Sequence, residues 1–140
     1  MVLYRNKMVA MAMAAELHLF YEDMLPLMDP EDPYAQAFRC INKDDYPKNS
    51  TVMASLLVVH KDYMSTKLSN FIIEKGILDG IAYGFKTVVG GSTNPISRKI
   101  SFKLGGKLIK EVNITRNGKT GKLYLLRNDL ADIIKVKSKL

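Results

Sequence analysis

The chain has 140 residues, which suffices for one domain of ordinary size, or for a small domain with an accessory helix. Hydrophobic residues make up 47% and charged residues 25%, so the composition argues against wholesale disorder. The single cysteine, Cys40, excludes an internal disulfide and a cysteine-based zinc site, and it fits a reducing, cytoplasmic location. No stretch approaches the roughly 18 apolar residues that a membrane span needs.

The net charge of +7 is distributed unevenly along the chain. Residues 1–49 carry five basic and eight acidic side chains, whereas residues 50–140 carry sixteen basic and six acidic ones. A surface dominated by positive charge favours a polyanion, and nucleic acid is the commonest polyanion. The sequence therefore predicts two parts: an N-terminal helical region over 1–49 and a nucleic-acid-binding domain over 50–140.

Residues 3–28 are predicted to form one helix, because apolar side chains recur there every three or four positions. Its apolar stripe is wider than a solvated helix needs. Two uses of that stripe stay open: packing on the rest of the chain, or pairing of residues 3–25 with a second copy in a homodimer. The prolines at 26, 30 and 33 end the helix. Residues 34–41 could form one short helix, and residues 42–50 are predicted to be a loop.

Residues 51–60 are almost wholly apolar, and they fit either a capped helix or a buried strand. A helix over residues 65–75 follows, with Ser65 as its N-terminal cap and Gly76 as its C-terminal cap. Two short helices joined by a tight turn form the helix-turn-helix pattern.

Residues 77–89 are rich in β-branched and aromatic side chains, which indicates a hairpin or an extended segment. Residues 98–104 alternate between apolar and polar side chains, as a strand does. Gly105-Gly106 fits a two-residue hairpin turn or the interior of a helix that runs to Glu111. The four-residue spacing of the apolar residues from Leu104 onward favours the helix.

Asn117-Gly118 is a strong hairpin signal between two predicted strands, residues 112–115 and 122–126. A last helix, capped by Asn128 or Asp129, is expected to run through residue 134.

The order of helix, helix, strand and basic hairpin is typical of a winged helix-turn-helix, so an α+β fold of this kind is predicted for residues 50–140. Asn70 can pair with adenine, and Lys67 can reach guanine or a phosphate. The hairpin tip suits phosphates, which position a protein without specifying sequence. The predicted DNA-binding residues are Lys61, Ser65, Thr66, Lys67, Asn70, Arg98, Lys99, Arg116, Asn117, Lys119 and Lys122.

Two segments resemble the small C-terminal DNA-binding-type domains of phage antirepressor proteins. The first is YMSTKLSNFIIEKGIL at 63–78, and the second runs from KISFKLGGKLIKEV at residue 99 through NGKTGKLYLLRNDLADII, which ends at residue 134. The resemblance lies within residues 50–134, and it implies a phage or prophage regulator with a DNA-binding or partner-binding module. Such proteins usually carry a long N-terminal domain, whereas the segment before residue 50 in this sequence is a predicted Met/Ala-rich helix followed by acidic loops.

Catalysis receives little support from the sequence. His18 has Glu22 four residues later, but a second histidine ligand at matching spacing is absent. Cys40 has no recognisable nucleophile context, and GFKTVVGGSTNP lacks the Gly-Lys-Ser/Thr ending of a phosphate loop. We therefore expect no catalytic residue, metal or cofactor.

The expected function is that of a small, non-enzymatic regulator that binds double-stranded DNA. The alternative is a protein-interaction module that binds a host or phage protein without contacting DNA. RNA binding through the basic hairpin is a third class, which the few exposed aromatic residues disfavour.

Overall fold

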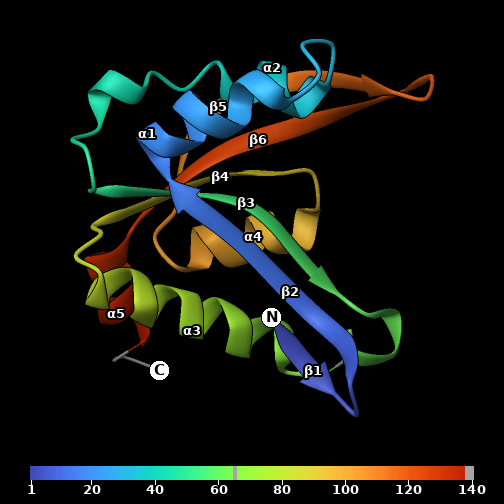
Figure 1. Cartoon of the computed structure of the whole chain (residues 1–140), viewed down its shortest axis with the longest axis vertical. Coiled ribbons are helices and arrows are strands. Elements are labelled where there is room, and N and C mark those ends of the chain that lie inside the picture. Colours follow the sequence, from blue (N-terminus) through green and yellow to red (C-terminus); the bar gives the residue numbers. More distant parts are fainter. Residues whose placement is uncertain (65, 138–140) are drawn as a thin grey trace.

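A computed structural model describes residues 1–64 and 66–137 of the chain. Its centre is a six-stranded mixed sheet in the order β1-β2-β3-β4-β6-β5 (Figure 1). The strands are β1 (Val2–Tyr4), β2 (Lys7–Glu16), β3 (Thr51–Val59), β4 (Thr87–Ser92), β5 (Lys107–Arg116) and β6 (Lys119–Asp129). β3 and β4 are parallel, and the other neighbouring strands are antiparallel.

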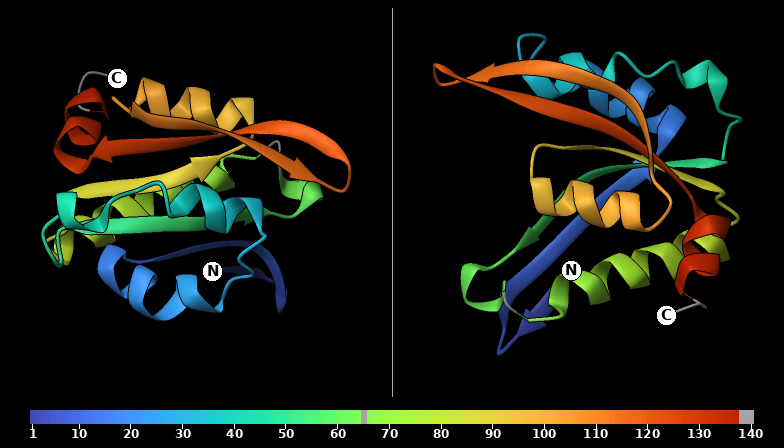
Figure 2. Two further views of the ribbon diagram at one scale, coloured as in Figure 1. Left: turned by 90° about the horizontal axis from the view of Figure 1, so that it is seen from above. Right: turned by 180° about the vertical axis from the view of Figure 1, so that it is seen from behind.

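Helices cover both faces of the sheet (Figures 1 and 2). One face carries α1 (Leu17–Leu19), the π-helical turn η1 (Phe20–Met24), the 3-10 turn η2 (Leu25–Leu27) and α2 (Pro33–Phe38). The other face carries α3 (Leu68–Ala82), α4 (Pro95–Lys103) and α5 (Leu130–Lys137). Two further 3-10 turns, η3 (Lys43–Asp45) and η4 (Lys61–Tyr63), lie in the connections before and after β3.

Each face of the sheet has its own hydrophobic core. Val89 of β4 packs with Leu123 and Leu125 of β6 against the α1–α2 side. Val88 instead packs with Ile77 of α3 and with residues of α5. Successive strand residues point to opposite faces, so the neighbours Val88 and Val89 serve different cores. The layers therefore form a helix–sheet–helix sandwich.

The parallel pair β3–β4 is joined by α3, because parallel neighbours need a crossover connection. Pairing runs from Thr51 opposite Thr87 to Ala54 opposite Gly90. A Cβ at Gly90 would lie 2.9 Å from the carbonyl oxygen of Ala54, so the two strands approach closely at that point. Beyond it, β3 continues beside β2 while β4 continues beside β6, and the parallel strands diverge.

The helix predicted over residues 3–28 is wrong in its first half. β1 and β2 form a hairpin through Arg5 and Asn6, which have φ angles of 47° and 61°. β2 also pairs with β3 from Ala10 to Glu16, and this placement between two strands overrides the helical propensity of its Met/Ala-rich sequence. Helical structure begins only at α1, so the long apolar helix on which the predicted homodimer depended does not form.

The predicted winged helix-turn-helix fold is also wrong. Residues 51–59 form strand β3, the option left open beside a helix, so the first helix of the predicted helix-turn-helix is a strand. α3 continues through Gly76, and the chain turns at Gly84, whose φ is +85°. The sheet, with its parallel pair and its helices on both faces, replaces the predicted helix pair and wing.

Residues 98–104, predicted as a strand, belong to helix α4 apart from Leu104, which caps its end. The side chain of Asn94 caps α4 by accepting a hydrogen bond from the Ile96 backbone N–H at 2.8 Å, and Pro95 occupies its first turn. The helix predicted to extend toward Glu111 is wrong, because Gly105 (φ +83°) ends α4 and β5 follows.

Three local predictions are confirmed. α2 lies mostly within the predicted helix over 34–41, and α5 follows Asp129 as expected. Asn117 and Gly118 have φ angles of 53° and 73° and form the tip of the β5–β6 hairpin.

Both parts of the predicted division at residue 49 contribute strands to one sheet, and the division itself stays a prediction. Among the described residues, no helix combines the length and the apolar character that crossing a bilayer requires.

Candidate functional site

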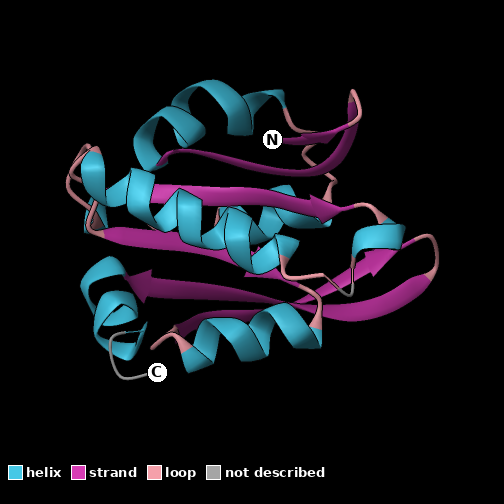
Figure 3. Cartoon of the chain, turned by 90° about the horizontal axis from the view of Figure 1, so that it is seen from below, coloured by secondary structure: helices cyan, strands magenta, loops and turns pink. Residues whose placement is uncertain are grey.

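A cleft of about 220 Å³ opens where β3 and β4 diverge. Its walls are residues 54–57 of β3 and residues 90–92 of β4, with the side chains of Ser97 and Ser101 from α4 and of Leu126 and Asn128 from β6. Because Ser97 and Ser101 belong to α4, the cleft lies on the face of the sheet that carries α3, α4 and α5. Figure 3 shows the sheet together with the helices that cover it. Ligands of open sheets bind outside the carboxyl ends of parallel strands, which is the end toward which this cleft widens.

The backbone of β3 is open toward the cleft. After Ala54, the backbone groups of β3 that face β4 have no strand partner within residues 1–64 and 66–137. Such an open edge can accept an extended ligand, whose amide groups pair with the backbone as a neighbouring strand would.

The polar side chains that line the cleft are hydroxyls and one amide. The hydroxyl oxygens of Ser92 and Ser97 lie 2.5 Å apart, and each is 3.0 Å from the carbonyl oxygen of Asn94. The apolar lining consists mainly of Leu56, Leu57, Val88 and Leu126. The cleft therefore combines hydrogen-bonding groups with an apolar lining.

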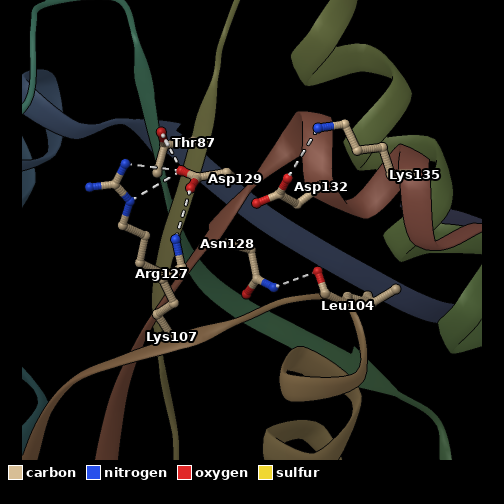
Figure 4. Close-up of polar contacts among 8 residues, drawn as sticks. All are labelled: Thr87, Leu104, Lys107, Arg127, Asn128, Asp129, Asp132 and Lys135. Carbon is tan, nitrogen blue, oxygen red and sulfur yellow. Dashed lines mark hydrogen bonds and ion pairs between the residues drawn. The ribbon is translucent and has the colours of Figure 1, made fainter.

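Asn128 connects β6 to the end of α4 at the floor of the cleft. Its Oδ1 accepts a hydrogen bond from the Ser101 hydroxyl at 2.6 Å. Its Nδ2 donates to the carbonyl oxygen of Ser101 at 3.0 Å. It also donates to the carbonyl oxygen of Leu104 at 3.3 Å, a contact drawn in Figure 4. A second contact holds α4 to β6, since the guanidinium of Arg98 lies 4.0 Å from the ring centroid of Tyr124. The wall formed by α4 is thus held by three hydrogen bonds of Asn128 and by the contact of Arg98 with Tyr124.

Helix α3, 15 residues long, begins beyond the carboxyl end of β3. The hydroxyl oxygen of Thr66 accepts a hydrogen bond from the backbone N–H of Leu68 at 3.3 Å, in the first turn. Lys61 and Lys67 are exposed on the same connection. Because the N-terminus of a helix carries partial positive charge, the start of α3 favours an anionic group.

The predicted DNA-binding residues come from three separate parts of the fold. Those near the start of α3 are Lys61, Thr66, Lys67 and Asn70; those of α4 are Arg98 and Lys99; those of the β5–β6 hairpin are Arg116, Asn117, Lys119 and Lys122. Figure 1 shows the hairpin tip near the top of the molecule and the β3–α3 connection toward the bottom, on the same side. Lys122 is paired with Glu111, and the hydrogen bond to that carboxylate raises the pKa of the lysine. Ser65 lies outside the described residues.

Sequence reasoning missed the serines and the asparagine of the cleft, which come from separate elements. The available signals were Gly90-Gly91 at the end of an apolar run and Asn94-Pro95, which is a helix-start signal. Neither signal shows that β3 and β4 are parallel neighbours, and the cleft depends on that pairing.

No protein-family model matches the chain, and no curated protein matches it in sequence. Solved structures do match it. A Salmonella typhimurium structure described as an acetyltransferase, solved with its cofactor acetyl-CoA, has 18% identity and a TM-score of 0.53, with 59% of this chain and 50% of that chain covered. An N-acetyltransferase from Staphylococcus aureus Mu50 has 14% identity and a TM-score of 0.59, with 91% of this chain and 64% of that chain covered.

A third similar structure is the C-terminal condensation domain of Ebony in complex with β-alanyl-dopamine, with 9% identity and a TM-score of 0.64. The match covers 89% of this chain and 67% of that domain. The chain therefore spans between half and two thirds of the length of these structures. At such low identity, the similarity establishes the fold.

These matches overturn the functional predictions. The resemblance to phage antirepressor domains is wrong, since the similar structures are acetyltransferases with the same kind of mixed sheet. The predicted non-enzymatic regulator of double-stranded DNA is wrong for the same reason, and the alternative of a protein-interaction module has no support either. The prediction that the chain is not an enzyme is contradicted by a fold that acetyltransferases share.

Proposed function

We propose that this chain is an acyltransferase that takes an acyl group from an acyl-coenzyme A thioester and transfers it to an amine. One observation carries the proposal: the cleft between diverging parallel strands, in a fold shared with a structure that holds acetyl-CoA as its cofactor. We place the enzyme in the cytosol, since its only cysteine is a free, exposed thiol that suits a reducing compartment.

The residues of the cleft fit such a donor. The pantetheine arm of coenzyme A is an extended chain with two amide groups, and the open backbone edge of β3 after Ala54 offers complementary partners. The serine hydroxyls on the opposite wall add donors and acceptors along its path. The phosphates would lie toward the start of α3, near Lys67 and the first backbone N–H groups. The β3–α3 connection, residues 60–67, contains no glycine, so we expect its lysines to contribute more of the phosphate binding than backbone does.

The donor supplies an activated acyl group: the amine nitrogen forms a C–N bond to the thioester carbonyl carbon as the C–S bond breaks, and the amine's proton passes to the leaving sulfur. The chain's own contribution is mainly positioning. Leu56, Leu57 and Leu126 exclude water from the reacting end, while Asn128 fixes the wall of α4. The close approach of Gly90 to Ala54 sets the point at which the strands part.

Calorimetric titration with acetyl-coenzyme A tests donor binding. Ser97→Trp puts a large ring into the cleft from an exposed position on α4, and we expect binding to be lost or weakened at least about tenfold. Ile96→Trp is the matched control, because Ile96 is 69% exposed and lies outside the cleft lining. Equal binding by the wild type and Ser97→Trp, or no binding by the wild type, would contradict the proposal.

Release of free thiol from acetyl-coenzyme A, followed with a thiol reagent in the presence of a panel of amines, tests the transfer. We expect amine-dependent thiol release that Ser97→Trp abolishes and Ile96→Trp retains. Thiol release that no amine accelerates would show that the cleft binds a thioester without transferring its acyl group to this class of acceptor.

A further inference from the structure

A second cavity, of about 720 Å³, lies at the opposite end of the parallel strands from the cleft. It is bounded by the start of β3 (Ser50, Thr51), the start of β4 (Lys86, Thr87) and the end of β6 (Arg127, Asp129). The loop over residues 45–49, the end of α3 and the start of α5 complete its wall. None of these residues lines the cleft between β3 and β4, so the cavity is a separate site.

The two carboxylates at this cavity already have partners. Asp129 accepts hydrogen bonds from Arg127 Nε at 3.2 Å and Nη2 at 3.0 Å, and its other oxygen lies 3.7 Å from Lys107 Nζ (Figure 4). Burial raises the pKa of Asp129, but the hydrogen bonds and charge of Arg127 and the charge of Lys107 outweigh that effect and leave the pKa below its ordinary value. Asp45 accepts a hydrogen bond from Asn42 Nδ2 at 3.0 Å.

The cations at the cavity outnumber these carboxylates. Lys48 and Lys86 both line it, both are exposed, and neither side chain has a hydrogen bond or an ion pair with any described residue. Arg127 is held in place by Asp129 and lies 5.5 Å from the ring centroid of Tyr46. Arg127 neutralises Asp129, and Asp45 offsets one of the two lysines, so the charged residues of the cavity wall keep a net positive charge.

Part of the remaining wall is apolar. Ile81 and Phe85 come from the end of α3 and the turn after it, and Ile134 comes from α5 with 48% of its surface exposed. A cavity that combines apolar side chains with two ammonium groups complements a ligand with an anionic head and an apolar body.

We infer that this cavity is a binding site for a small organic anion, a phosphate or carboxylate on an aromatic or aliphatic body, held by Lys48 and Lys86 against Ile81, Phe85 and Ile134. The inference is independent of the proposed function, because it uses no residue of the cleft.

Heteronuclear NMR titration of the full chain tests the inference, with phenyl phosphate and benzoate as anionic probes and benzyl alcohol as the neutral one. We expect saturable amide shifts at residues 48–51, 84–87 and 130–134 with an anionic probe, and none with benzyl alcohol. Shifts with phenyl phosphate alone would assign a phosphate head, and shifts with benzoate as well would assign a general anion site.

The variant Lys48→Gln with Lys86→Gln should weaken the binding of the anionic probe about tenfold. The matched control is Lys110→Gln with Lys119→Gln, which has the same net charge, removes two exposed lysines outside both cavities and should bind as the wild type does. Ile134→Glu, at an exposed position, adds a negative charge at the rim and should also weaken binding.

Three results would overturn the inference: no saturable shift at the cavity with either anion, shifts confined to residues 90–92 of the cleft, or equal weakening in the control variant. The last would show non-specific attraction to a basic protein. The cleft amides report separately on the proposed function, so failure at one site is distinguishable from failure at the other.

Discussion

Replacing Gly90 by alanine tests the close approach of β3 and β4 directly. The new Cβ would lie 2.9 Å from the Ala54 carbonyl oxygen and 3.4 Å from the Ala54 Cβ. Ordinary contacts between a carbon and a backbone oxygen are about 3.3–3.6 Å, so the strands must separate by several tenths of an ångström. Overpacking of this kind costs about 1–3 kcal/mol, offset by about 0.5–1 kcal/mol from removing a glycine in a strand. We expect a net loss of about 1–2 kcal/mol in the free energy of unfolding.

Urea unfolding followed by circular dichroism measures that loss, and thermal unfolding should show a melting temperature lower by about 3–5 °C for each kcal/mol. Gly76→Ala is the matched control, because a Cβ there meets no atom within 4 Å and the residue lies inside α3. That variant should be more stable than the wild type by about 0.4–1 kcal/mol. If Gly90→Ala proves as stable as the wild type, the strands are not held at this separation, and the reasoning about the cleft fails.

Three further outcomes are expected. Asn128→Ala leaves Ser101 and two backbone carbonyls without their partner and should lower the free energy of urea unfolding by about 1–3 kcal/mol; an unchanged midpoint would mean that α4 is held by other contacts. The pKa of Asp129 is lower in the folded chain than in the unfolded one, so the stability that the ionised carboxylate contributes is complete above its ordinary pKa and is lost as the pH falls below that value. The free energy of unfolding of Asp129→Asn should therefore decline less steeply at acid pH than that of the wild type. Burial is the main cause that raises the pKa of the Tyr21 hydroxyl to about 12, so the stability that the neutral hydroxyl contributes is complete below about pH 10 and is lost as the pH rises toward 12. The stability of Tyr21→Phe should therefore fall less steeply than that of the wild type above pH 10, and an identical pH dependence would refute the assignment.

Local sequence signals were reliable where the residues themselves determine the backbone. Asn117-Gly118 supplies the two positive φ angles of a tight hairpin turn, and the structure has the turn there. Pro33 begins α2, while Asp32 caps it by accepting hydrogen bonds from the N–H groups of Tyr34 and Ala35. Such positions depend on neighbours within a few residues, so the sequence alone predicts them.

The partners of each strand depend on residues far away in the chain. β2 has a Met/Ala-rich sequence that suits a helix, and it is a strand because β1 and β3 pair with it on both sides. Residues 51–59 left helix and strand equally open, and pairing with β2 and β4 decides for the strand. Residues 98–104 alternate like a strand, yet the Asn94 cap and the packing of α4 on β6 place most of them in a helix.

For the charged residues, too, the sequence determined one property and the tertiary structure another. The sequence by itself determined that the C-terminal part is strongly basic, and that composition led to a predicted DNA surface. Only the tertiary structure decided where the charges lie: Lys122 pairs with Glu111, Lys107 and Arg127 surround Asp129, and the hairpin tip is far from the start of α3. The candidate cleft has the same origin, because it exists only where β3 and β4, 36 positions apart in register, pair in parallel and then diverge. Local propensity carries no information about that long-range pairing.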